Sequence, residues 1–105
     1  MLIISNHSID NSAYTGFEWD DGKYQQTLEK RQISFIDASQ LFEEYTRFTY
    51  ISHNTETAEK RFVTVGLLKN KLFAVIYTIR AENIRIITAR RAHVREERIY
   101  KTLYA

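Results

Sequence analysis

The chain has 105 residues, 44% hydrophobic and 13% aromatic, which is enough apolar material for one domain with a single core and too much for a disordered chain. It contains no cysteine, so disulfide bonds, a thiolate nucleophile and a thiolate zinc site are excluded. The net charge is +2, and no segment approaches the ~20 apolar residues of a membrane span, so we expect a soluble cytoplasmic protein with no membrane partner.

The N-terminal residues 1–15 are mostly polar and predict an extension to the domain, in which Leu2–Ile4 is the stretch suited to an added strand. Residues 16–105 are expected to form the single folded domain. At its start, residues 17–19 alternate apolar, polar and apolar side chains, which predicts a short strand.

Two helices are predicted next. Asp20 or Asp21 can accept the free amide hydrogens of a first helical turn, so we expect a helix that ends at about Arg31. Ser34 with Asp37 three residues later resembles a capping box and predicts the start of a second helix. Apolar residues follow at helical spacing and predict its buried face: Phe35, Ala38, Leu41, Phe42 and Tyr45.

After the second helix, the hydrophobic pattern changes to the two-residue period of β-strands. Four stretches rich in β-forming residues predict strands, namely 47–51, 61–68, 72–79 and 83–88. Short connections between successive strands predict antiparallel pairing, and Leu72–Ile79, apolar on both faces, is expected to be central. A last helix is predicted from about Ala92 to Leu103. The expected fold is α+β: two N-terminal helices, an antiparallel sheet of about four strands and a C-terminal helix.

Basic residues concentrate in the C-terminal quarter of the chain. Residues 80–105 contain seven basic and three acidic residues, a net charge of +4, whereas residues 1–79 have a net charge of −2. Such a segment can attract an anion or a phosphate backbone, and a solvated helix face is the simpler interpretation. Arg91, Arg95 and Arg98 have the spacing of a stripe along the last helix.

Glu96 is predicted to point at least partly inward, because it precedes the apolar residues of the last helix by one turn. A carboxylate beside a core needs a cationic or hydrogen-bonding partner, and Arg90, Arg85 and Arg61 are the candidates.

Conventional catalytic machinery is missing. The three glycines are isolated, so there is no phosphate-binding glycine loop, and the three histidines lack metal-ligand spacing. Arginines near strand ends remain, and guanidinium groups bind phosphate bidentately and can stabilise the charge of its transition state. We expect Arg61 and Arg90 to converge in one anion pocket. The proton-transferring groups available near these elements are Glu59, Glu96, Tyr100 and His93.

Three fragments, in order and spacing, resemble the BrnT family of toxins. The first is Phe17-Glu18-Trp19-Asp20 followed by Lys23 and by Lys30-Arg31-Gln32-Ile33-Ser34-Phe35. The second is residues 59–66, Glu-Lys-Arg-Phe-Val-Thr-Val-Gly, and the third is residues 84–92, Ile-Arg-Ile-Ile-Thr-Ala-Arg-Arg-Ala, with Glu96 and Tyr100 after it. The resemblance covers about residues 17–104.

This resemblance implies a RelE-like fold and metal-independent RNA cleavage that slows translation, with no cofactor. It also implies a BrnA-type antitoxin with a ribbon-helix-helix domain, and DNA operator binding only through the toxin–antitoxin complex. The catalytic residues implied are Arg61, Arg90 and Arg91 on the scissile phosphate, Glu96 orienting an arginine, and Tyr100 beside them. The RNA-binding residues implied are Lys23, Lys30, Arg31 and Arg85.

Some positions depart from the family pattern. Arg31 stands where a histidine is usual, and an arginine cannot replace a histidine in proton transfer. An alternative is therefore an interaction module of weak or no catalytic activity, which binds the antitoxin and acts as co-repressor. A direct nucleic-acid-binding protein is a third reading, but a net charge of +2 is modest for it.

Overall fold

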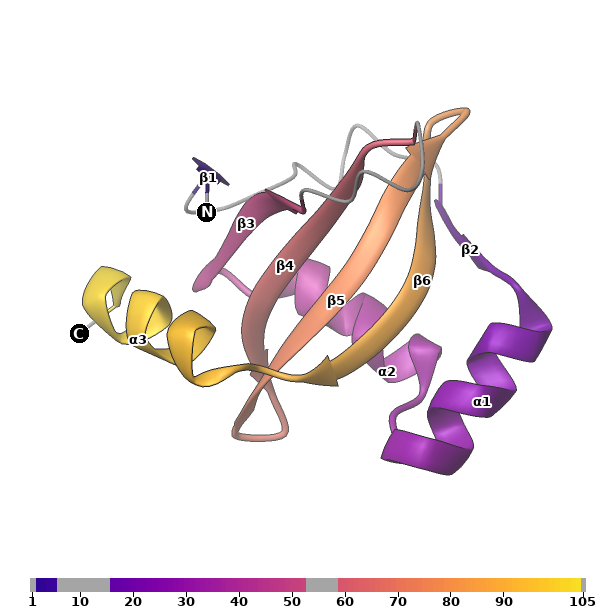
Figure 1. Ribbon diagram of the computed structural model, residues 1–105, viewed down its shortest axis with the longest axis horizontal. Helices are drawn as coiled ribbons and strands as arrows, with labels where there is room; N and C mark the ends of the chain where they lie inside the picture. Colours follow the sequence, from indigo (N-terminus) through magenta and orange to yellow (C-terminus); the bar gives the residue numbers. More distant parts are fainter. Residues whose placement is uncertain (1, 6–15, 53–58, 105) are drawn as a thin grey trace.

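One mixed sheet organises the molecule (Figure 1). The computed structural model describes residues 2–5, 16–52 and 59–104. In this part of the chain the strands lie in the order β1-β3-β4-β5-β6-β2. Their bounds are β1 Leu2–Ser5, β2 Gly16–Trp19, β3 Arg47–Ser52, β4 Arg61–Leu68, β5 Lys71–Arg80 and β6 Asn83–Arg91.

The predicted sheet of about four antiparallel strands is wrong in strand number and partly wrong in direction. The four strands predicted for the sheet are present as β3 to β6 and pair antiparallel, and the short strand predicted at residues 17–19 is confirmed as β2. The stretch suited to an added strand forms β1, which pairs antiparallel with β3, whereas β2 pairs parallel with β6. No hairpin joins β2 to β6, because most of the domain lies between them, so their relative direction is not restricted to antiparallel. Residues 6–15 of the predicted extension lie outside the described residues.

Two tight turns join the three longest strands. Lys69 and Asn70 have φ angles of 53° and 66° between β4 and β5, as expected for an asparagine-containing turn. Ala81 and Glu82 have φ angles of 47° and 68° between β5 and β6. Positive φ at both central residues is the pattern of the two-residue hairpin that matches the twist of a sheet.

The predicted helices are confirmed, with changes at their ends. α1 is Asp21–Arg31 and begins after the cap Asp20; α2 is Phe35–Ser39 and begins after the cap Ser34. A 3₁₀ turn, Gln40–Glu43, replaces the expected continuation of α2. α3 is Val94–Leu103, and β6 continues to Arg91 instead of ending at Thr88. The expected helical stripe of three arginines is therefore wrong, because Arg91 belongs to β6.

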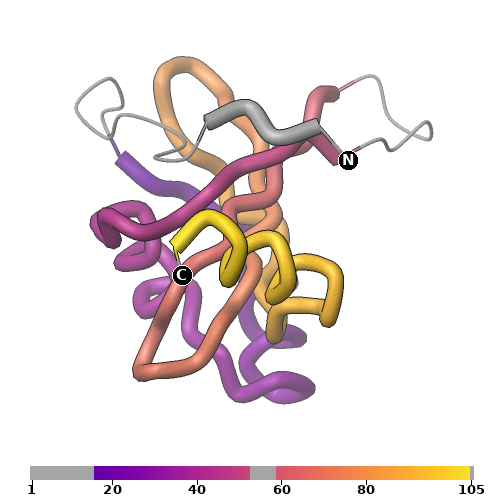
Figure 2. Tube along the Cα trace, turned by 90° about the vertical axis from the view of Figure 1, so that its left-hand side faces the viewer, coloured from indigo at the N-terminus to yellow at the C-terminus, as the bar shows by residue number. Residues whose placement is uncertain are grey.

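α2 and α3 cover opposite faces of the sheet (Figures 1 and 2). One core cluster joins α2 and the 3₁₀ turn to the sheet residues Val75, Tyr77, Ile84, Ile86 and Ala89. The other joins Tyr100 of α3 to Phe48, Val63, Val65 and Ala74. We call the side of the sheet that carries this second cluster the α3 face. No described helix is long and apolar enough to cross a membrane.

Register places the candidate arginines on these faces. Val65 pairs with Ala74, and Ala74 pairs with Arg90, so Arg90 lies on the α3 face. Arg61 is two and four residues before Val63 and Val65, and side chains alternate along a strand, so Arg61 lies on the same face.

We predict that Gly66→Ala destabilises the protein by about 1–3 kcal/mol, the usual cost of overpacking a core. A Cβ at this position would lie 2.2 Å from Leu41 Cδ2 and 3.4 Å from the Cβ of Arg47. Gly16→Ala is the matched control, since its Cβ would meet only a side-chain oxygen at 4.0 Å. Chemical denaturation measures both; equal stability of the two variants would contradict the packing described here.

Candidate functional site

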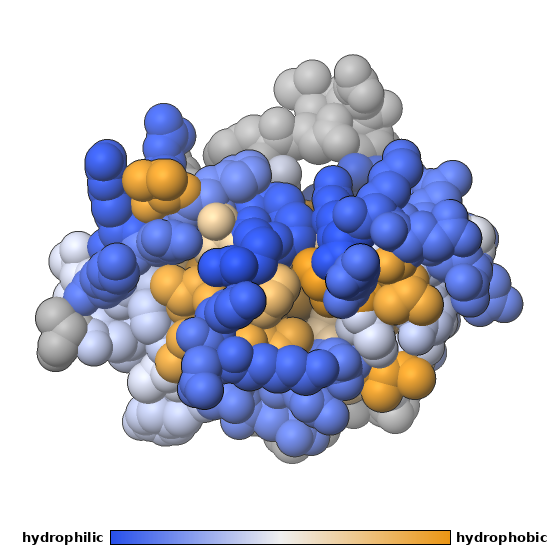
Figure 3. All heavy atoms as spheres, turned by 90° about the horizontal axis from the view of Figure 1, so that it is seen from below, coloured by the Kyte–Doolittle hydropathy of each residue, from blue (hydrophilic) through white to orange (hydrophobic). Residues whose placement is uncertain are grey.

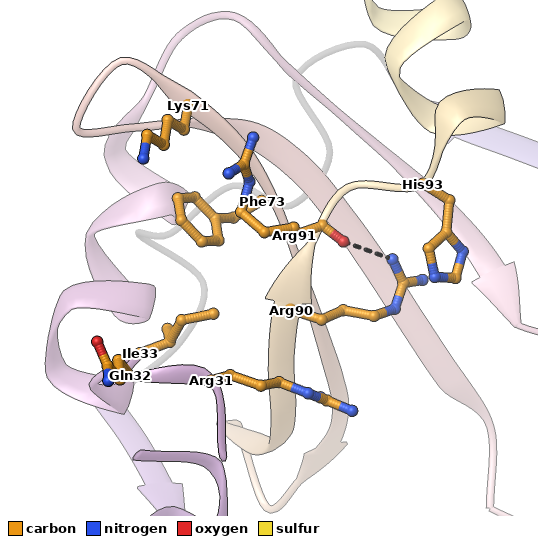
Figure 4. Close-up of a pocket in the computed structure, with 8 residues that line it drawn as sticks. All are labelled: Arg31, Gln32, Ile33, Lys71, Phe73, Arg90, Arg91 and His93. Carbon is orange, nitrogen blue, oxygen red and sulfur yellow. Dashed lines mark hydrogen bonds between the residues drawn. The ribbon is translucent and has the colours of Figure 1, made fainter. Parts of the chain in front are cut away.

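A large cavity lies where the end of β6 meets the connection to α3, and it is basic. Its volume is about 620 Å³, and its lining is Arg31, Gln32, Ile33, Lys71, Phe73, Arg90, Arg91 and His93 (Figure 4). None of the described residues that line it is acidic. Seen from below, strongly hydrophilic side chains cover much of the molecule, with apolar surface between them (Figure 3). Four cationic side chains around one cavity make it a candidate anion site.

Arg90 is held in this cavity by a buried carboxylate. Its Nη1 lies 2.7 Å from Glu96 Oε1, and its Nη2 lies 3.0 Å from Glu96 Oε2. The Glu96 side chain is 1% exposed and that of Arg90 is 19% exposed. The expectation that Glu96 points inward and needs a cation is confirmed, with Arg90 as its partner and not Arg85 or Arg61.

Two further groups complete the shell around the Glu96 carboxylate. The Tyr50 hydroxyl donates to Oε2 at 2.5 Å, and the His93 amide donates to Oε1 at 2.8 Å. Burial alone would raise the pKa of Glu96, but the hydrogen bonds from Arg90, Tyr50 and His93 lower it below its ordinary value. Burial and the Glu96 carboxylate raise the pKa of Tyr50 to about 12. Glu96 is therefore an anion with both oxygens occupied, suited to positioning Arg90.

Arg31 and Arg91 are anchored by backbone carbonyls. Arg31 Nη1 donates to Thr88 Oγ1 at 3.0 Å and to the carbonyl of Ala89 at 3.1 Å, which ties the end of α1 to β6. Arg91 Nε donates to the carbonyl of Leu72 at 3.3 Å, and its guanidinium lies 5.3 Å from the centre of the Phe73 ring. These contacts restrain both arginines at the rim, where Arg31 and Arg90 extend in the same direction (Figure 4).

Two smaller cavities continue from the large one. A cavity of about 150 Å³ between α1 and β6 is lined by Lys23, Gln26, Thr27, Lys30, Arg31 and Thr88. A third, of about 180 Å³, is lined by Asp20, Lys23, Glu59, Arg61, Thr78, Arg80, Arg85, Ile86 and Ile87. Arg31 lines both the first and the second cavity and Lys23 lines both the second and the third, so the three cavities are neighbours, and we call this row of cavities the track.

The expectation that Arg61 and Arg90 converge in one pocket is wrong. They lie on the same face of the sheet but line different cavities. Arg61 starts β4 at the end of the sheet where β6 begins, whereas Arg90 is near the end of β6. Arg85, which shares the Arg61 cavity, pairs with Thr78, whereas Arg90 pairs with Ala74 four residues away on β5, about 13 Å along the strand.

Tyr100 lies apart from all three cavities. Its hydroxyl lies 2.9 Å from Thr46 Oγ1, and its ring packs in the core of the α3 face. The structure thus groups Arg90, Arg91 and Arg31 in one cavity, with Glu96 behind them. It groups Lys23 and Lys30 beside Arg31, and Arg61 with Arg85 farther along.

Lys71 and Tyr50 are site residues that the sequence interpretation missed. Lys71 lies just outside the stretch 72–79 predicted as a strand, and its position near the end of β6 depends on the register of β5 with β6. Tyr50 lies within the predicted strand 47–51, but the candidate partners of Glu96 were all arginines. Alternation within β3 gives the signal that was available, since Tyr50 shares a face with Phe48.

The arrangement can bind a polyanion and hold it against fixed donors. Guanidinium groups stabilise charge that develops on a phosphate, and fixed donors need no reorganisation during reaction. His93 lines the same cavity and supplies an imidazole, the side chain suited to proton exchange near neutral pH. Among the described residues, no three His, Asp or Glu side chains are grouped as metal ligands.

We predict that Tyr50→Phe destabilises the protein by about 1.5–3 kcal/mol, the range for a hydrogen bond to a charged group. The substitution removes only the hydroxyl that donates to Glu96. Tyr24→Phe is the control, because its hydroxyl makes a long contact of 3.5 Å with Ser34. Urea denaturation compares the variants; a Tyr50→Phe protein as stable as Tyr24→Phe would contradict the proposed strength of the network.

The lowered pKa of Glu96 predicts how the stability of the fold depends on pH. Its pKa in the folded chain lies below the ordinary 4.5, so the unfolded chain binds the proton more tightly. The stabilisation is complete above that ordinary value and is lost as the pH falls through the folded-state pKa. The stability difference between the natural chain and Glu96→Gln should therefore shrink from about pH 7 to about pH 3. Glu97→Gln is the control on the same helix. A stability difference for Glu96→Gln that does not change with pH would contradict the lowered pKa of Glu96.

The chain matches a known protein family over most of its length. Residues 19–96, about three quarters of the chain, match the family model described as ribonuclease toxin, BrnT, of type II toxin-antitoxin system. No curated protein sequence matches the chain. The matched residues include Arg31, Arg61, Arg90 and Glu96. The chain therefore belongs to the BrnT family of ribonuclease toxins of type II toxin–antitoxin systems.

Proposed function

We propose that this chain cleaves RNA without a metal ion, with the scissile phosphate bound in the cavity lined by Arg90 and Arg91. The 2′-hydroxyl attacks the adjacent phosphorus, the bond from phosphorus to the 5′-oxygen breaks, and a 2′,3′-cyclic phosphate forms. The proton of the 2′-hydroxyl passes to a base, and the 5′-oxygen receives a proton. The reaction therefore requires two proton transfers and stabilisation of the negative charge that develops on the phosphate.

The observation that carries the proposal is the fixed guanidinium of Arg90 in a cavity without acidic lining. Its two bonds to Glu96 use one N–H of each terminal nitrogen, and one of these nitrogens also contacts the Arg91 carbonyl at 3.2 Å. The remaining N–H groups are held at a set angle by the carboxylate behind them. A donor fixed in advance supports the transition state better than a mobile surface arginine.

We assign proton transfer to His93, because it is the imidazole among the residues lining the cavity. Glu96 does not fit this role, since each of its oxygens accepts two hydrogen bonds. Tyr100 does not fit it either, because its hydroxyl contacts Thr46 outside the cavity. In this proposal Glu96 positions Arg90, and Tyr100 packs α3 on the sheet.

The remaining parts of the proposal derive from family membership. We propose a RelE-like arrangement, action in the cytoplasm through inhibition of translation, and neutralisation by a BrnA-type antitoxin with a ribbon-helix-helix domain. Operator DNA would be bound only through that complex. Coexpression tests this part: an adjacent short reading frame that encodes such a protein should restore growth, and failure to do so would contradict the antitoxin assignment.

A second candidate function is an antitoxin-binding co-repressor with weak or no catalysis. The observation that favours it is Arg31, whose Nη1 is bonded to Thr88 and the Ala89 carbonyl and which cannot transfer a proton. If Arg31 only ties α1 to β6, replacing it will lower the stability of the fold, and neither the natural chain nor the variant will cleave RNA. Cleavage assays therefore separate the two candidates.

We predict that the natural chain cleaves RNA in the presence of EDTA. In Arg90→Lys, kcat should fall about 10²- to 10³-fold, as for loss of one transition-state donor. Lysine keeps the charge beside Glu96 and loses the bidentate geometry, so the fold should survive. Arg98→Ala, on the exposed side of α3, is the control and should cleave normally. Circular dichroism verifies folding, and a folded natural chain without EDTA-resistant cleavage would favour the co-repressor.

A further inference from the structure

The third cavity contains a guanidinium nitrogen that lacks a partner. Arg61 Nε is buried and has no hydrogen-bond partner within the described part of the chain. A buried donor left unpaired costs about 1–3 kcal/mol, so such groups in native proteins call for a ligand or another explanation. The Arg61 side chain also lines a cavity of about 180 Å³.

The acidic groups near Arg61 are already engaged by other donors. Glu59 accepts two hydrogen bonds from Arg80, at 2.7 and 3.2 Å. Asp20 caps α1 by accepting from the Lys23 amide at 2.9 Å. Glu18 lies 3.5 Å from Arg85. The cavity is lined by four basic residues, Lys23, Arg61, Arg80 and Arg85, against two acidic ones, Asp20 and Glu59, so its balance favours an anion.

The position of this cavity relative to Arg90 points to the same ligand. The levels of Arg85 and Arg90 in the sheet are four residues of β5 apart, about 13 Å. Arg61 and Arg90 line different cavities at these two levels. Lys23 and Lys30 of α1 and Arg31 line the cavity between them. A single strand that runs from the Arg90 cavity to the Arg61 cavity passes these three cationic side chains on the way, as in the electrostatic grooves that bind single-stranded nucleic acids.

We propose that the Arg61 cavity binds a second, non-scissile phosphate of the RNA strand whose scissile phosphate lies beside Arg90. This inference rests on the proposed function and adds a subsite to it. Arg61 is then a binding residue remote from the reacting atoms, with Arg85 and Lys23 supporting it. Substrates with one phosphate cannot use this subsite, and longer strands bind more tightly because they do.

Kinetics on two substrates separate a remote subsite from a catalytic role. With a longer single-stranded oligoribonucleotide, Arg61→Ala should raise KM about tenfold at unchanged kcat, equal to about 1.4 kcal/mol. With a dinucleoside monophosphate, which has a single phosphate, Arg61→Ala should leave kcat/KM unchanged. Arg90→Lys should impair both substrates. A lower kcat for Arg61→Ala on the dinucleoside monophosphate would overturn the proposal, because Arg61 would then act on the scissile phosphate.

Binding of a 2′-O-methyl oligonucleotide, which cannot be cleaved, tests the subsite without catalysis. The slope of log K against log salt should fall by about 0.7 in Arg61→Ala, the value for one phosphate contact on a single strand. Arg61→Lys should keep the slope, and Arg98→Ala is the matched control. An unchanged slope and affinity in folded Arg61→Ala would overturn the subsite. Binding without cleavage by the natural chain would contradict the proposed function and leave the subsite supported.

Discussion

The buried ion pair between Arg90 and Glu96 is the interaction on which the account depends. Placing a carboxylate at 1% exposure is costly unless its charge is matched, and here Arg90, the Tyr50 hydroxyl and the His93 amide match it. These partners come from β6, β3 and the start of α3, so the pair joins the last helix to two strands of the sheet. One network therefore stabilises the docking of α3 and sets the direction of a guanidinium at the cavity. Removing either charge would leave the other buried, which makes the pair a constraint on the fold as well as on the site.

The sheet explains why cationic residues from distant parts of the sequence form a track. β6 carries Arg85, Arg90 and Arg91, and α1 lies along it and supplies Lys23, Lys30 and Arg31. The hydrogen bonds from Arg31 to Thr88 and Ala89 attach the end of α1 to β6, so the two cationic rows stay adjacent. The chain has a net charge of only +2, and the local arrangement is nonetheless strongly basic. Local geometry, more than total charge, determines where this surface can attract an anion.

Local patterns predicted most of the fold. The caps Asp20 and Ser34 and the patterns of β3 to β6 are signals within a few residues, and each is confirmed. The parallel pairing of β2 with β6 and the continuation of β6 to Arg91 depend on partners far along the chain, which no local pattern specifies. The same limit applies to the site. An inward carboxylate at Glu96 could be inferred from helical spacing, but the separation of Arg61 from Arg90 follows from strand register.

The most direct test of the central claim is a crystal structure of the chain with a 2′-O-methyl oligonucleotide bound. We predict one phosphate against Arg90 and Arg91 in the cavity that they line, with the Arg90–Glu96 pair intact behind it. An oligonucleotide whose phosphates all lie elsewhere, with that cavity vacant, would contradict this prediction.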